Sequence, residues 1–169
     1  MALLVGRHIN KIDKKGRVSV PKVFRAALTD SGFAGIYAFP FFKFHAIEAC
    51  GEHFMQRLSD SLDDNLDLFS DDQDDIVAIT LENAHQLAFD PEGRITLPEE
   101  LMSYAGLSDQ ALFVGRGARF RIWSPGAYEE NRAQAFARAR VRGATVKLGP
   151  AAASGAGSNV IKPNLSEED

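Results

Sequence analysis

The chain has 169 residues, of which 45% are hydrophobic and 25% charged, and its formal net charge is −4. This apolar fraction supports a folded core in one or two small domains and excludes a chain that is disordered throughout. The single cysteine, Cys50, excludes an intrachain disulfide and a zinc site built from several cysteines. The apolar run near the start is too short for a signal peptide or a membrane span, so we expect a soluble, intracellular protein.

Charge is unevenly distributed along the chain. Residues 1–25 hold seven basic residues and one acidic residue, whereas residues 60–75 hold eight aspartates and no base. Residues 132–147 hold five basic residues and no acid. A polyanion responds to the field within about one Debye length, ~8 Å at physiological salt, so the negative net charge does not exclude nucleic-acid binding.

Two segments share one pattern, and their first residues, Asp13 and Asp90, stand 77 positions apart. Residues 13–21 and 90–98 both read Asp-x-x-Gly-Arg, then apolar, hydroxyl, apolar and proline. Asp and Gly at this spacing predict a tight turn, and the alternation that follows predicts a half-buried strand ending at proline. Apolar residues at helical spacing come next, so each copy predicts a strand, a charged turn, a strand and a short helix. Two copies are too few for a solenoid and indicate a pseudo-twofold pair.

The remaining segments carry simpler patterns. The second copy predicts a hairpin with strands over 111–114 and 120–123, and Gly35 to Phe42 is the matching apolar run in the first. Ile47, Phe54 and Leu58 form one stripe that predicts a helix within 45–58, and the Ala- and Arg-rich residues 127–142 predict another. The aspartates of 60–75 indicate a solvated acidic linker.

The predicted domain organisation follows from these patterns. It consists of a first repeat over residues 7–52, a helix and acidic linker over 53–82, a second repeat over 83–127, a basic C-terminal helix over 128–148 and a disordered tail over 149–169, where Ala, Gly and Ser dominate.

The two Asp-x-x-Gly-Arg-apolar-x-apolar-Pro motifs resemble those of the swapped-hairpin proteins of the AbrB/SpoVT/MazE class. The tandem pair, with Phe24-Arg25 after the first motif and Gly-Ala-Arg-Phe-Arg-Ile-Trp-Ser over residues 117–124 after the second, resembles the bacterial MraZ family over roughly residues 5–135. The resemblance implies an α+β, mostly β fold, in which the hairpins of two pseudo-twofold-related units interlock into a small double-psi-type β-barrel with flanking helices.

The same resemblance implies a function. Members of the family regulate transcription of the division and cell-wall gene cluster by binding short G-rich direct repeats upstream of it, as ring-shaped homo-oligomers. The implied partners are double-stranded promoter DNA and further copies of the chain, and the implied location is the cytoplasm at the nucleoid. Neither a membrane nor a small-molecule substrate is expected.

The basic residues around the first motif are the candidate DNA contacts. Arg17 is predicted to pair with guanine O6 and N7 in the major groove, and the alternative is an ion pair with Asp13 that holds the turn. The other predicted contacts suit phosphates, which position a protein without specifying sequence: Lys11, Lys14, Lys15, Lys22 and Arg25. Lys22 and Arg25 lie one turn apart in the following helix and suit a neighbouring subunit equally well.

The second motif departs from the first in charge. Pro91 and Glu92 stand where the first motif has lysines, which puts DNA contact by the second repeat in doubt. Arg94 retains the motif, and we expect a structural ion pair there and a weaker contribution to DNA binding.

Other chemistries fit less well. Asp63, Asn65 and Asp67 have the spacing of an EF-hand loop, but Leu68 replaces the required glycine. Cys50 and His53 stand at helical i, i+3 spacing, but no third group is placed to orient the histidine. We therefore predict no enzyme, no cofactor and no metal. Two rival classes stay open: an antitoxin-like or other protein-interaction module on the same barrel, and a hydrolase or metal-binding protein.

Overall fold

The computed structural model describes residues 3–28 and 32–150, and the tail predicted for 149–169 lies outside the described residues from 151 onward. The first repeat contains β1 (Arg7–Lys11), β2 (Arg17–Ser19), α1 (Lys22–Ala27), β3 (Gly35–Phe41), β4 (Ala46–Cys50) and α2 (Glu52–Asn65). After α3 (Asp71–Ile79), the second repeat contains β5 (His85–Ala88), β6 (Arg94–Thr96), α4 (Glu99–Ala105), β7 (Gln110–Gly115), β8 (Phe120–Trp123) and α5 (Pro125–Arg142). The predicted order of strand, turn, strand, short helix and hairpin is confirmed in both copies, and the α+β, mostly β class with it.

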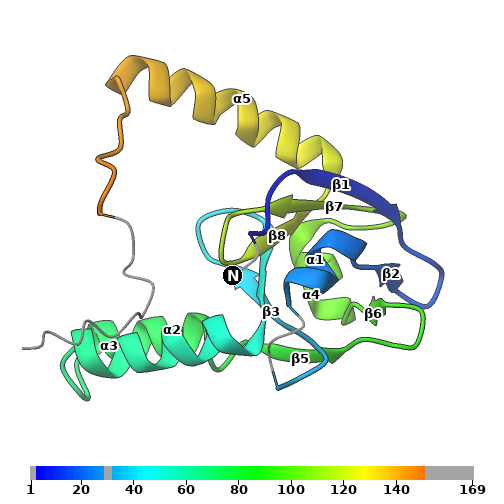
Figure 1. Cartoon of the computed structure of the whole chain (residues 1–169), viewed down its shortest axis with the longest axis horizontal. Coiled ribbons are helices and arrows are strands. Elements are labelled where there is room, and N and C mark those ends of the chain that lie inside the picture. The colour runs from blue at the N-terminus through cyan, green and yellow to red at the C-terminus, as the bar shows by residue number, and fades with distance from the viewer. Residues whose placement is uncertain (1–2, 29–31, 151–169) are drawn as a thin grey trace, which may run out of the picture.

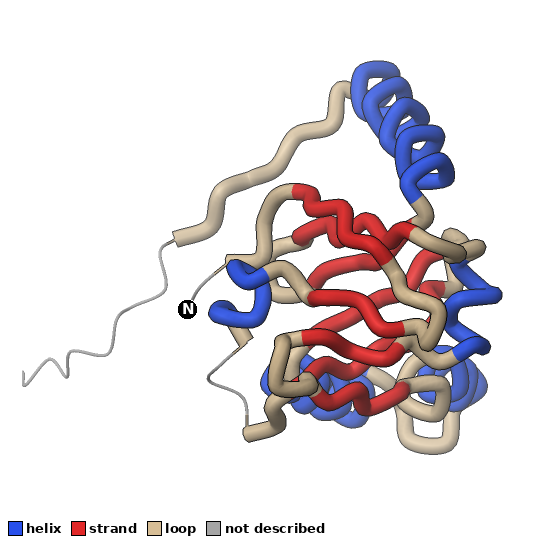
Figure 2. The backbone as a smooth tube through the Cα atoms, turned by 90° about the vertical axis from the view of Figure 1, so that its right-hand side faces the viewer, coloured by secondary structure: helices blue, strands red, loops and turns tan. Residues whose placement is uncertain are grey.

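The strand order shows that the two repeats exchange strands. Six strands form one sheet in the order β1-β7-β8-β4-β3-β5, and β2 pairs with β6 in a separate ribbon. Figure 2 shows strands stacked side by side through the body of the molecule. β1 of the first repeat lies beside β7 of the second, β5 lies beside β3, and the two hairpins meet where β4 pairs with β8. The order reads the same from either end once the copies are exchanged, so the interlocked, pseudo-twofold arrangement of hairpins is confirmed.

The predicted closed barrel is wrong. The sheet ends at β1 and β5, which do not pair with each other, and among the described residues an isolated bridge between Ile12 and Val18 is the one β-bridge that links β2 toward β1. Each ribbon strand has three residues and is followed two positions later by Pro21 or Pro98. Because proline has no backbone N–H, the pairing stops there and the ribbon is too short to close the sheet.

The main core lies between the sheet and a layer made by the ribbon, α1 and α4. Its centre is formed by Val18, Phe24, Ile95, Leu101 and Phe113, each at most 1% exposed. Burying a side chain of this size contributes about 1.5–3 kcal/mol relative to its exposed state. Both copies of the motif supply the same positions to this core, which explains why the two turns outside it are built alike.

α2 and α5 occupy equivalent positions, each following the second strand of a hairpin. α2 packs Phe54, Met55 and Leu58 near Phe39 and Cys50. α5 packs only its first turns, where Tyr128 contacts Trp123, and then leaves the body of the molecule (Figure 1). The C-terminal helix predicted at 127–142 is confirmed. No helix among residues 3–28 and 32–150 is long and apolar enough to cross a membrane.

One prediction near the end of the first repeat is wrong, and the acidic segment after it contains more helix than its sequence pattern indicated. Ile47 is fully buried in β4, so the helix begins at Glu52 and not near residue 45. The aspartate-rich segment is mostly helical, because α2 continues to Asn65 and α3 begins at Asp71. Ser70 caps α3 by accepting a hydrogen bond from the amide of Gln73, and aspartates in a first turn interact favourably with the helix dipole.

Candidate nucleic-acid interface

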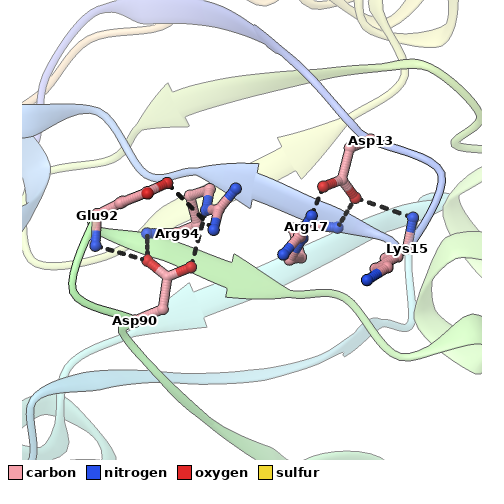
Figure 3. A network of polar contacts seen from close by, with 6 residues as sticks. All are labelled: Asp13, Lys15, Arg17, Asp90, Glu92 and Arg94. Carbon is pink, nitrogen blue, oxygen red and sulfur yellow. Dashed lines mark hydrogen bonds and ion pairs between the residues drawn. The ribbon is translucent and has the colours of Figure 1, made fainter.

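The first motif forms a turn held by one carboxylate. The Oδ1 atom of Asp13 accepts hydrogen bonds from the amides of Lys15 and Arg17, both at 2.9 Å, and its Oδ2 accepts one from Arg17 Nε at 2.6 Å (Figure 3). These bonds, that from the Arg17 amide most of all, hold the pKa of Asp13 below its usual value of 3.8. Gly16 takes the positive φ of +80° that the turn requires. The ion pair given as the alternative for Arg17 is present.

The second motif repeats this turn atom by atom. Asp90 Oδ1 accepts from the amides of Glu92 and Arg94 at 2.9 Å, and Oδ2 accepts from Arg94 Nε at 2.8 Å (Figure 3). The pKa of Asp90 is lowered by the same causes. Glu92 also lies 3.1 Å from Arg94 Nη2, so Arg94 is held by two carboxylates and its pKa is raised. The ion pair predicted at Arg94 is present.

The β2–β6 ribbon places both arginines on one outer face. Arg17 pairs with Thr96 and Ser19 with Arg94, while Val18 and Ile95 between them face the core. In Figure 3 the two guanidinium groups lie between the two aspartates. The Arg17 side chain is 35% exposed and bonds Asp13 through Nε, and no hydrogen bond within the described residues engages its Nη atoms. These Nη groups can donate to an acceptor that approaches the ribbon.

Three polar residues near this face were not among the predicted site residues. Ser19 and Thr96 are exposed hydroxyl residues of the ribbon, and the Asn10 side-chain amide donates to the Ser19 carbonyl at 2.6 Å, joining β1 to β2. The signal for Ser19 and Thr96 was the hydroxyl position that both motifs share.

Each turn packs against the short helix of the other repeat, and the two contacts are equivalent. A Cβ on Gly16 would lie 3.6 Å from Met102 Sδ of α4, and a Cβ on Gly93 would collide with the Arg25 guanidinium of α1. Arg25 also donates from Nε to the Val20 carbonyl at 3.1 Å. Arg25 and Met102 therefore occupy equivalent positions, and Arg25 supports the second turn.

The predicted basic residues divide between the two ends of the ribbon. Lys11, Lys14 and Lys15 are exposed at or beside the first turn, where Lys14 and Lys15 share a groove of about 490 Å³ with Glu99. Lys22 and Arg25 instead line a groove of about 450 Å³ at the second turn, together with the residues Asp90, Pro91 and Gly93. The structure thus separates Lys22 and Arg25 from the first turn, with which the sequence had grouped them. Arg94 lies with Arg17 on the ribbon.

A buried ion-pair cluster joins the two hairpins and was also missed. Glu48 of β4 is 4% exposed and lies 2.7 Å from Arg119 Nε and 2.8 Å from Arg121 Nε. The Arg121 guanidinium lies 3.9 Å from the centre of the Phe41 ring. Glu48 and Arg121 face each other in the β4–β8 pairing, so this cluster fixes the join between the repeats.

The residues weighed as a nucleophile or as metal ligands lie in these places in the structure. Cys50 is buried, and burial raises the pKa of its thiol to about 12, so the thiol stays protonated at neutral pH. Asp63 and Asn65 lie within α2, which is not an EF-hand loop. In the described part of the chain, no three His, Cys, Asp or Glu side chains gather in a way that could hold a metal ion.

The interlocked hairpins, each preceded by an Asp-x-x-Gly-Arg turn, define a tandem swapped-hairpin protein, as the resemblance to the AbrB/SpoVT/MazE class implies. Comparison with known proteins makes this assignment more specific. A family model described as "MraZ protein, putative antitoxin-like" matches residues 80–144. The transcriptional regulator MraZ of Parvibaculum lavamentivorans is 47% identical over 124 residues, which cover 73% of this chain and 76% of that protein.

Two further relatives match over more of the chain. The transcriptional regulator MraZ of Rickettsia canadensis is 41% identical over 139 residues, covering 81% of this chain and 93% of that protein. The transcriptional regulator MraZ of Pelagibacter ubique is 39% identical over 145 residues, covering 86% of this chain and 93% of that protein. The chain belongs to the MraZ family.

Proposed function

We propose that the chain is a DNA-binding transcriptional regulator that contacts DNA with the outer face of the β2–β6 ribbon and with the first turn. The observation that carries the proposal is the partly exposed Arg17, whose Nη groups have no partner within the described residues and whose Nε is fixed by Asp13. The major groove admits a two-stranded ribbon, and an arginine pairs best there with guanine O6 and N7. The relatives' shared name as transcriptional regulators supports the same function.

The lysines of the first turn set the register on the duplex. Lys14 and Lys15 are exposed beside Arg17, and Lys11 is exposed at the end of β1 that leads into the turn. Ammonium groups in these positions suit phosphates, which supply affinity without sequence preference. At the second turn, the negatively charged Glu92 would repel a duplex, and it pairs with Arg94. Arg94 therefore contributes less to DNA binding than Arg17.

The finer proposal concerns the site and the assembly. A guanine-reading arginine fits short G-rich direct repeats, here those upstream of the division and cell-wall gene cluster, in the cytoplasm at the nucleoid. One turn makes few phosphate contacts, and a ring-shaped homo-oligomer presents several equivalent turns to successive repeats, which raises avidity. The repeats would then lie about one helical turn, ~10 bp, apart.

Fluorescence anisotropy tests the proposal with the duplex upstream of the protein's own gene and a scrambled duplex, at two salt concentrations. We expect tight binding to the upstream duplex alone and its loss in Arg17→Ala. Arg57→Ala, which removes an exposed arginine of α2, is the matched control and should bind like the native protein.

The antitoxin-like alternative rests on the description of the matching family model. It predicts equal, weak and salt-sensitive binding to both duplexes, because only a basic patch would then act on DNA. That result would overturn the proposal and direct attention to a protein partner.

A further inference from the structure

The outer part of α5 is a basic helix that leaves the body of the molecule (Figure 1). No residue of α5 is buried, and residues 132–147 carry five basic residues and no acid. Phe136 is 52% exposed and lies between Arg132 and Arg140, whose guanidinium carbons are 5.0 and 5.9 Å from the ring centre. Because residues four apart share a face of a helix, these three side chains form one exposed apolar and basic stripe.

The α2–α3 hairpin presents the complementary surface. At its base, a groove of about 340 Å³ is walled by the aromatic rings of Phe41, Phe42 and Phe54 and by Ile79. Arg119 also lines the groove, and its Nε atom lies 2.7 Å from Glu48, which Arg119 shares with Arg121. The aromatic rings make most of the wall, so the groove suits an apolar side chain. The surface beyond it is acidic, since all eight aspartates of residues 60–75 are exposed.

The pseudo-symmetry of the fold shows what α5 lacks. α2 is covered by α3, with Leu62 and Gln73 buried between them and Gln73 Nε2 donating to the Leu62 carbonyl at 3.2 Å. α5 is the equivalent of α2 in the second repeat, and no helix among the described residues covers it. The exposed stripe of α5 therefore lacks the helix partner that α3 provides for α2.

We propose that α5 of one protomer docks on the α2–α3 hairpin of a second copy, with Phe136 in the aromatic groove and Arg140 against Asp75. The proposal rests on the self-assembly proposed above and names its contact surface. The spacing supports it: Asp75 and Ile79 are four residues apart on α3, and Phe136 and Arg140 are four residues apart on α5. At a rise of 1.5 Å per residue both pairs span about 6 Å, so the helices match when they run antiparallel.

The contact has to join two chains. α5 and the α2–α3 hairpin lie at opposite ends of the molecule in both views (Figures 1 and 2). Two different surfaces of each copy would then meet head to tail, and such a contact forms a ring if the rotation between copies closes.

Disulfide cross-linking between different chains tests the contact directly. A tagged chain carrying Phe42→Cys at the rim of the groove is mixed with an untagged chain carrying Phe136→Cys, and we expect a mixed dimer on oxidation. The native Cys50 is buried, which gives a low background. Val141→Cys is the control, because Val141 is 88% exposed and lies about 140° around α5 from Phe136, so it should not cross-link. Absence of the Phe42–Phe136 link in a multimeric protein would overturn the proposal.

Charge exchange tests the polar part of the contact. We expect Arg140→Glu or Asp75→Lys alone to shift the sedimentation coefficient to smaller species, and the two together to restore it. Arg138→Glu, on the other side of α5, should leave the assembly unchanged. Failure of the combined variant to restore the assembly would overturn the contact. An Arg140→Glu variant that still sediments as the native assembly but binds DNA less well would also overturn it and would assign α5 to DNA binding instead. A native protein that sediments as a monomer and still binds the upstream duplex would overturn the contact and leave DNA binding intact.

Discussion

The turns at Asp13 and Asp90 have the same geometry and opposite charge. In each, one aspartate accepts two amides and one guanidinium, and the glycine takes a φ near +80°. The two positions after the aspartate are Lys-Lys in the first turn and Pro-Glu in the second. Neither residue uses its side chain to bond the aspartate that closes the turn, so these two residues can vary while the backbone stays the same.

The helix that each turn packs against partly offsets the charge difference between the two turns. The basic first turn shares a groove with Glu99 of α4, and the acidic second turn shares one with Lys22 and Arg25 of α1. Opposite charges therefore meet at both ends of the ribbon. The aspartate, glycine and arginine of each motif preserve the scaffold, and the two intervening residues determine which end can attract DNA.

The largest expected difference between the turns is in DNA recognition. Arg17→Ala should lower affinity for the specific duplex by about 1–3 kcal/mol, the range for a bidentate arginine–guanine pair. Arg94→Ala should lower this affinity much less, because Glu92 already binds the Arg94 guanidinium. Anisotropy titration measures both, with thermal unfolding to show that each variant is folded. Equal losses would mean that the turns act alike on DNA.

Substitution of the two glycines tests the shared backbone. Gly16→Ala should destabilise the protein by about 1–2 kcal/mol, because a side chain is strained at positive φ. Gly93→Ala should cost more, since its Cβ also displaces the Arg25 guanidinium. Urea unfolding measures both, and Arg25→Ala should recover part of the loss in Gly93→Ala only. No recovery there would show that Arg25 does not restrain the second turn.

Exchange of the intervening charges tests the non-specific part of binding. Lys14→Ala should weaken binding to all sequences alike and flatten the plot of log affinity against log salt by about one unit. Glu92→Lys should strengthen binding to specific and scrambled duplexes together. A change of preferred sequence in Lys14→Ala would contradict the separation of phosphate contacts from base contacts.

The smallest expected effect is on acid stability. Because the pKa of Asp13 and that of Asp90 are both lowered in the folded protein, each carboxylate stabilises it above its usual value of 3.8. This contribution is lost as the pH falls below that value. Asp13→Asn should therefore flatten the fall of unfolding free energy below about pH 4. Asp90→Asn should lose less stability at neutral pH, since Arg94 keeps Glu92. Parallel unfolding curves for native and variant proteins across pH 2–5 would contradict this.

The parts of the fold predicted from sequence were those held by local chemistry. The turn at Asp13 and its copy are closed within five residues, so spacing alone predicts them. Ile47 was misassigned because a fully buried strand and the buried side of a helix look alike in a short apolar run. The contact of Arg25 with Gly93 joins distant parts of the chain, and no local pattern reports it. The DNA contacts are predictions that the Arg17 and Lys14 variants test.

The palindromic strand order also has a consequence during synthesis. β1 emerges from the ribosome first, yet Arg7 pairs with Val114 of β7. At typical elongation rates of ~5–20 residues per second, the first strand waits roughly 5–20 s for its neighbour. The β3–β4 hairpin can close at once, whereas β1 has no place in the sheet until the second hairpin has been translated. A nascent chain halted after the first repeat holds half of an interlocked pair, and the sheet cannot be completed until β7 and β8 have been translated.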